Sequence, residues 1–100
     1  MITAAQLRAA RALLGIGQHR LAELSGLSVP TIQRMEASEA MIRGNVDSLM
    51  KLISALDAAG IELIAEGASS QAQGRGVRLK ALNGARTYSG GDTAAGAPGV

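Results

Sequence analysis

The 100-residue sequence predicts a mainly α fold, a bundle of four to five short helices followed by a short antiparallel β-hairpin. Apolar residues recur at helical spacing through most of residues 1–60, and glycines and capping residues divide that stretch into short segments. The apolar pattern then changes to the two-residue period of strands. We therefore expect a helical domain over residues 1–60, a hairpin over residues 61–82 and a disordered tail over residues 83–100.

The first helix is predicted from signals at both of its ends. Thr3 followed three residues later by Gln6 matches a capping box, in which each side chain bonds the other residue's backbone. The helical spacing of leucine and alanine then continues up to Gly15. The first helix is therefore expected over about residues 4–14.

The next two helices are short and are separated by a tight turn. One of them opens at Gln18 and stops at Gly26, which suits a left-handed helix cap. Ser28 is a good N-cap, and Pro30 falls in the first turn of the following helix, where a missing backbone donor costs nothing. That helix is expected over about residues 29–37.

A longer helix and two strands complete the prediction. After a loop over residues 38–44, apolar residues trace one face of a helix that ends at Gly60. Apolar and polar side chains then alternate in residues 61–66 and again in residues 76–82. Paired antiparallel, these two strands would place glutamates beside basic residues on their outer face.

Composition limits both the core and the kinds of site. The chain has no Phe, Trp or Cys, so its core must consist of Leu, Ile, Met and Ala, and disulfides and thiolate metal sites are excluded. His19 is the only histidine and lacks neighbouring ligands, so we expect no metal and no cofactor. No paired acid–base or nucleophile constellation is present, and we expect no enzyme activity. No apolar run reaches the roughly 18 residues of a membrane span, and we expect a soluble cytoplasmic protein without a membrane partner.

Charge is distributed unevenly along the chain. The net charge is +2 overall, with +2 in residues 1–44, −3 in residues 45–66 and +3 in residues 67–100. The total is too small to indicate nucleic-acid binding by itself. Candidate binding residues must therefore be identified from their arrangement.

The helix over residues 28–37 has two chemically different sides. A helical wheel places Ile32, Met35 and Glu36 on the inward side. The opposite side carries Pro30, Gln33, Arg34 and Ala37. A guanidinium suits guanine, a carboxamide suits adenine and apolar carbons can meet the thymine methyl group. Composition alone favours a solvated helix face, whereas two short helices around a glycine turn favour a helix-turn-helix that reads the major groove.

The segment LGIGQHRLAELSGLSVPTIQRMEAS, residues 14–38, resembles the DNA-binding domain of the xenobiotic-response-element (XRE) family of regulators, which includes phage repressors and Cro. The resemblance covers residues 3 to about 58 and implies a lambda-repressor-like helix-turn-helix bundle. Residues 60–80 also resemble the C-terminal strand extension of small regulators of this family from alphaproteobacteria.

The resemblance also implies roles for individual residues. Base reading is implied for Val29, Pro30, Gln33 and Arg34. Contact with the DNA backbone is implied for Gln18, Ser28 and Thr31, and the basic group available for the same role in the following loop is Arg43. A structural ion pair between two helices is implied for Arg11 and Glu36, and the inward position of Glu36 on the wheel independently demands a partner.

The hairpin predicts self-association, because a lone two-stranded ribbon is marginal in water and one side of this one is apolar. We expect a homodimer, and a monomer whose ribbon folds onto the longer helix is the alternative. The expected dimer interface contains Ile53, Leu56, Ile61, Leu63, Val77 and Leu79.

The sequence therefore predicts a DNA-binding transcriptional regulator, a repressor or autoregulator, which binds double-stranded DNA as a homodimer with the helix over residues 28–37 in the major groove. Two alternatives stay open. An antitoxin would use the same fold for its operator and the tail or a strand to bind a toxin partner. A protein-interaction module without DNA binding is less favoured, because protein interfaces prefer aromatic anchors and this face has none.

Overall fold

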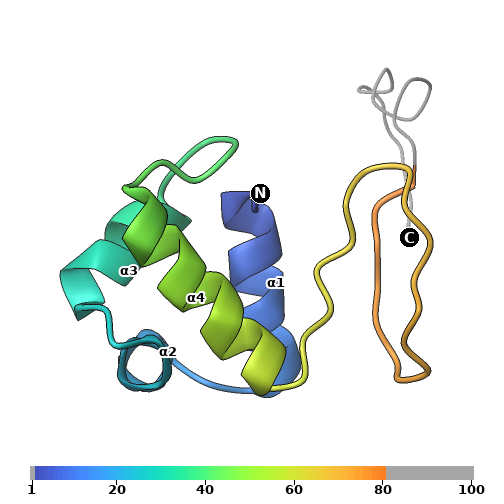
Figure 1. The fold of residues 1–100 in the computed structure, drawn as a ribbon, viewed down its shortest axis with the longest axis horizontal. Coiled ribbons are helices and arrows are strands. Elements are labelled where there is room, and N and C mark those ends of the chain that lie inside the picture. The colour runs from blue at the N-terminus through green and yellow to red at the C-terminus, as the bar shows by residue number, and fades with distance from the viewer. Residues whose placement is uncertain (1, 81–100) are drawn as a thin grey trace, which may run out of the picture.

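The computed structural model describes residues 2–80, and its helices occupy the first three quarters of them (Figure 1). In chain order they are α1 (Ala4–Leu14), α2 (Gln18–Ser25), α3 (Val29–Glu36) and α4 (Val46–Ala58). α2 contacts both α3 and α4, while α1 contacts α3. A mainly helical fold with a helix-turn-helix is thereby confirmed, and the helix boundaries lie within two residues of those expected.

Helices begin and end at the residues that the sequence marks. The N–H of Gln6 bonds Thr3 Oγ1 at 3.0 Å and the N–H of Thr3 bonds Gln6 Oε1 at 2.9 Å, which completes the capping box of α1. Ser28 caps α3 with its hydroxyl. Gly15 and Gly26 end α1 and α2 with φ of 68° and 75°, a left-handed conformation that glycine adopts without strain.

The core lies where the four helices meet and contains aliphatic side chains and methionine. Its buried members are Ile2, Ala4, Leu7, Ala10, Leu21, Ala22, Ile32, Met35, Ile42, Leu49, Leu52 and Leu56. Each fully buried large side chain contributes on the order of 1.5–3 kcal/mol through the hydrophobic effect. Because Ile32 and Met35 belong to this core, α3 is held by one side and exposes the other.

The loop between α3 and α4 is anchored to the N-terminal residues. The N–H of Ala4 bonds the carbonyl of Ala40, and the N–H of Ile42 bonds the carbonyl of Ile2, both at 3.0 Å, in an isolated antiparallel bridge. This pairing carries Ile42 into the core. The sequence predicted a loop here without the bridge.

The hairpin expected over residues 61–82 is not confirmed. Between residues 61 and 80 the structure shows no strand, and its backbone contains no ladder of hydrogen bonds. Ile61 and Leu63 instead pack partly against the core, and beyond them the chain leaves the bundle as an open arch (Figure 1). The predicted tail over residues 83–100, one of the two kinds of segment that the antitoxin alternative offers to a toxin, lies outside the described residues.

The predicted dimer-interface residues fall into three groups. Leu56 is fully buried in the core of its own chain. Ile53, Ile61 and Leu63 are partly buried. The last two, Val77 and Leu79, are exposed and lie in the arch.

Candidate nucleic-acid interface

The outer side of α3 carries most of the predicted base-reading residues. Pro30, Gln33 and Arg34 are exposed. Val29 is half-buried and packs against the edge of the core, so it offers less surface than the sequence suggested. The exposed side of α3, formed by Pro30, Gln33 and Arg34, therefore combines a guanidinium and a carboxamide, and we call it the reading face after the role predicted for it.

A chain of hydrogen bonds orders the polar side chains on this face. Ser28 accepts a bond from the N–H of Thr31 at 3.2 Å, and the two hydroxyl oxygens lie 2.8 Å apart. Arg34 Nη2 donates to Thr31 Oγ1 at 3.3 Å. This contact uses one of the five N–H donors of the guanidinium, so the others remain free to bind a ligand.

One buried carboxylate joins three helices behind the reading face. Glu36, only 7% exposed, accepts bonds from Arg11 Nε at 2.7 Å and Arg11 Nη2 at 2.9 Å. Gln18 Nε2 donates to the same carboxylate at 3.0 Å. The ion pair expected between α1 and α3 is thus present as a two-pronged contact, the strong geometry for arginine and carboxylate.

The protonation of this pair follows from its surroundings. Burial favours the neutral acid and would raise the pKa of Glu36, but the hydrogen bonds from Arg11 and Gln18 outweigh burial, so the pKa lies below its usual value. The hydrogen bond to Glu36 likewise raises the pKa of Arg11. Both groups are therefore charged at neutral pH, and the ion pair fixes the C-terminal end of α3.

Arg8 also positions α3, and sequence reasoning missed it. Its Nη1 donates to the backbone carbonyl of Glu36 at 2.5 Å. The last carbonyls of a helix have no partner within it, and a cation near that end is favourable. The signal that could have revealed Arg8 is its spacing of three residues from Arg11, which places both on one face of α1.

The predicted backbone-contacting residues lie in three places around α3. Gln18 is the first residue of α2, and its side-chain Nε2 already donates one hydrogen bond to Glu36. Ser28 and Thr31 lie at the start of α3. Arg43 lies exposed in the loop before α4, and within residues 2–80 neither it nor Arg34 forms an ion pair.

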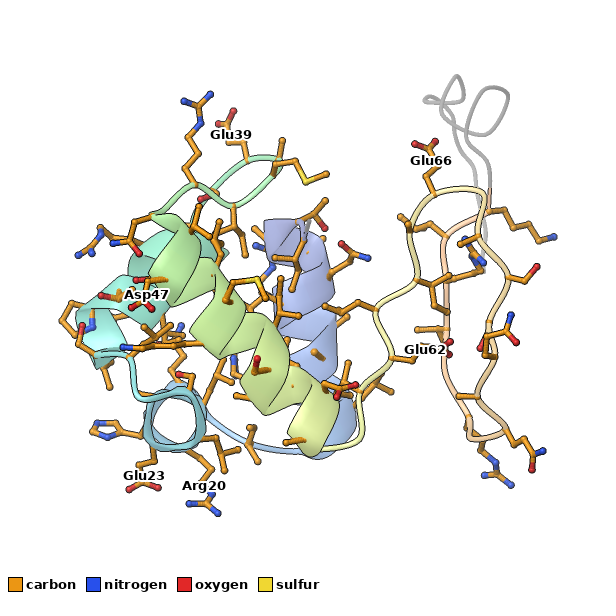
Figure 2. The ribbon with its side chains drawn as sticks, viewed as in Figure 1. Arg20, Glu23, Glu39, Asp47, Glu62 and Glu66 are labelled. Atoms are coloured by element: carbon orange, nitrogen blue, oxygen red, sulfur yellow. The ribbon has the colours of Figure 1, made fainter. Side chains whose placement is uncertain are left out.

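Other charged side chains form exposed ion pairs on the surfaces of α2 and α4. Arg20 and Glu23 project from α2 into solvent and pair at 3.0 Å (Figure 2). Asp47 in the first turn of α4 pairs with Lys51 at 3.3 Å. Such exposed pairs contribute little to stability. Arg20 is therefore a useful comparison for Arg34, because it is an exposed arginine outside the reading face.

Across residues 2–80, no group of three or more His, Cys, Asp or Glu side chains is placed to hold a metal ion. None of the helices described here is long and apolar enough to cross a membrane.

Comparison with known families adds one finding. A family model for a helix-turn-helix domain matches residues 7–59, from within α1 to the end of α4. Searches of curated proteins and of solved structures each gave no match. Because the family match ends at residue 59, it does not test the resemblance of residues 60–80 to alphaproteobacterial regulators.

Proposed function

The chain belongs to the helix-turn-helix family of the XRE type, a DNA-binding family, and we propose that it is a sequence-specific transcriptional regulator that places α3 in the major groove of double-stranded DNA. The observation that carries this proposal is the two-sided character of α3. Its inner side is fixed by the core and by Glu36, while its outer side presents Gln33 and Arg34 to solvent. Each good bidentate contact to a base contributes about 1–3 kcal/mol of discrimination.

The surrounding polar groups suit the DNA backbone. Gln18 donates one N–H to Glu36, which leaves its second N–H for a phosphate oxygen. The hydroxyls of Ser28 and Thr31 and the exposed guanidinium of Arg43 supply further donors on either side of α3. Such contacts set the register of the protein on the duplex but do not read its sequence.

The active form in this proposal is a homodimer that represses transcription, including that of its own gene. Two copies of α3 would enter successive major grooves at half-sites about 34 Å apart and block access of RNA polymerase. The extension over residues 61–80 supports a dimer, because it leaves Val77 and Leu79 in water.

Binding to the promoter upstream of the protein's own gene tests the proposal. Fluorescence anisotropy at two salt concentrations should show tight binding that weakens with salt, because phosphate contacts release counterions. A random duplex of equal length is the control. Equal affinity for promoter and random duplex would exclude sequence-specific regulation.

Replacement of Arg34 tests the reading face. Arg34→Ala should reduce affinity for the preferred sequence by about 1–3 kcal/mol and leave affinity for a random duplex nearly unchanged. Arg43→Ala should weaken binding to all sequences and lower the magnitude of the salt slope by about one. Arg20→Ala is the matched control and should have little effect on either duplex. If Arg34→Ala behaves like Arg20→Ala while circular dichroism shows all variants folded, the assignment of the reading face is wrong.

A further inference from the structure

An open groove on the side of α4 is not used by the proposed DNA contacts. It lies between α4 and residues 60–63 and has a volume of about 590 Å³. Ile53, Ile61 and Leu63 give it an apolar lining, and the acidic residues Asp57 and Glu62 also line it. The Glu62 carboxylate is bonded to residues 70–72, so Asp57 is the acidic group left for a ligand. We call this surface the α4 groove. It suits a ligand that is apolar on one side and positively charged.

Residues 75–80, Arg-Gly-Val-Arg-Leu-Lys, have these properties, and we call them the basic segment. Val77 is 82% exposed and Leu79 is 80% exposed. In an extended backbone two residues at this spacing point to the same side. The cations of the segment are Arg75, Arg78 and Lys80, and within the described chain none of them forms an ion pair.

The basic segment is held away from the α4 groove of its own chain. Arg78 donates to the carbonyl oxygen of Ala68 at 2.5 Å and to that of Ala65 at 3.2 Å. Residues 61–66 consequently lie between α4 and the basic segment (Figure 1). The apolar side chains of the segment remain in water while the groove stays open.

We propose that the basic segment of each subunit docks in the α4 groove of a second copy of the chain. This inference rests on the proposed function in that it specifies how the regulator dimerises. Charge complementarity selects the occupant, because the charged residues that line the groove, Asp57 and Glu62, are both acidic and the basic segment carries a net charge of +3. Each subunit offers one groove and one segment, so the exchange is reciprocal and closes as a two-fold dimer.

The position of the groove is compatible with DNA binding. The extension and α3 lie on opposite sides of the bundle, with α1 and α4 between them (Figure 1). Docking at the α4 groove therefore leaves the outer side of α3 uncovered in both subunits. Val77 and Leu79 would leave water in the same step, which supplies the apolar part of the association.

Analytical ultracentrifugation of charge-reversed full-length chains tests the exchange. One variant is Asp57→Arg, which reverses a charge in the groove, and the other is Arg75→Glu/Lys80→Glu, which reverses the segment. Each variant alone should sediment as a monomer at concentrations where the wild type is a dimer. An equimolar mixture should dimerise again, because one interface then pairs the two native surfaces and the other pairs the two reversed surfaces.

The apolar contribution has its own variant and matched control. Leu79→Ser should raise the dimer dissociation constant at least tenfold. Leu13→Ser, at a leucine that is 54% exposed on α1, should leave it unchanged. Circular dichroism verifies that every variant is folded.

Several outcomes overturn the inference. A wild-type chain that stays monomeric throughout, a dimer that none of the variants weakens, or weakened variants that do not recover on mixing would each do so. None of these results depends on DNA. The proposed function would fail in a different way. The wild type would then form a dimer but would bind the promoter and a random duplex with equal affinity.

Discussion

Two glutamates organise two regions of this chain, the helical bundle and the extension. Glu36 accepts three hydrogen bonds from side chains on α1 and α2. Glu62 also accepts three, all from residues 70–72, the shortest being 2.6 Å (Figure 2). In both cases the hydrogen bonds hold the pKa of the carboxyl below its usual value.

The difference lies in burial and in what each carboxylate joins. Glu36 is buried and connects residues that are 18 and 25 positions away in sequence. Glu62 is exposed and connects residues 8 to 10 positions away. Water competes for the bonds of an exposed group, whereas in the interior an unmade bond is costly. Glu36 is therefore expected to contribute strongly to the stability of the bundle, whereas Glu62 holds one conformation of the extension.

The largest expected effect comes from Glu36→Gln. This change keeps the shape of the side chain but leaves the Arg11 guanidinium without an opposite charge. It should lower the free energy of unfolding by about 3 kcal/mol, the low end for a broken buried pair, because water still reaches part of Arg11. Urea denaturation followed by circular dichroism measures this. Glu39→Gln, in the exposed loop after α3 (Figure 2), is the control and should change stability by less than about 0.5 kcal/mol. Equal effects of the two changes would contradict the role of Glu36.

Low pH is expected to have an intermediate effect on the free energy of unfolding. The pKa of Glu36 is lower in the folded chain than its ordinary value of 4.5, so the unfolded chain binds more protons and stability rises with pH. This contribution is fully present above the unfolded pKa and is lost as pH falls through the folded pKa. Below about pH 5 the free energy of unfolding should therefore fall more steeply for the wild type than for Glu36→Gln. Parallel curves would show that Glu36 does not account for the acid sensitivity of the bundle.

The bundle was largely predictable because its signals are local. The capping box of Thr3 and Gln6 and the N-cap Ser28 involve residues three positions apart, so the sequence alone specifies where α1 and α3 begin. Helical spacing likewise identified Ile32 and Met35 as the inner side of α3. The exposed side of α3 follows from the same spacing.

The remaining features depend on partners that are distant in sequence. Alternation in residues 61–66 indicates which side chains share a face, but it does not specify a strand partner. In the structure the carbonyl of Ile64 accepts a bond from Gln6 Nε2 at 3.2 Å, a contact with α1 that no local pattern announces. Leu56, which was expected at a dimer interface, packs in the core of its own chain. Helical spacing does not distinguish an apolar position that faces its own core from one that faces a partner.

The contact of Gln18 with Glu36 was also not predicted from the sequence. The resemblance gave Gln18 a phosphate role, and the spacing of 18 residues from Glu36 carries no helical or strand period. Only the packing of α2 against α3 brings the two side chains together. Replacing Gln18 would therefore disturb the bundle as well as any phosphate contact, which makes Arg43 the cleaner residue for testing backbone binding.

The smallest expected effect comes from Glu62→Gln. The neutral carboxamide is a weaker acceptor than the carboxylate, so the amides of Gln71 and Ala72 should exchange faster with solvent. The thermal midpoint of the bundle should not change, because Glu62 is exposed and bonds only within the extension. Hydrogen exchange followed by NMR measures the exchange rates of the two amides, and circular dichroism measures the thermal midpoint of the bundle.

A fall in the thermal midpoint as large as the one that Glu36→Gln causes would mean that the extension unfolds together with the bundle. Unchanged exchange at both amides would mean that contacts other than Glu62 hold residues 70–72. Faster exchange with an intact bundle would instead show an extension able to rearrange while α3 stays in place, as docking on a second subunit requires.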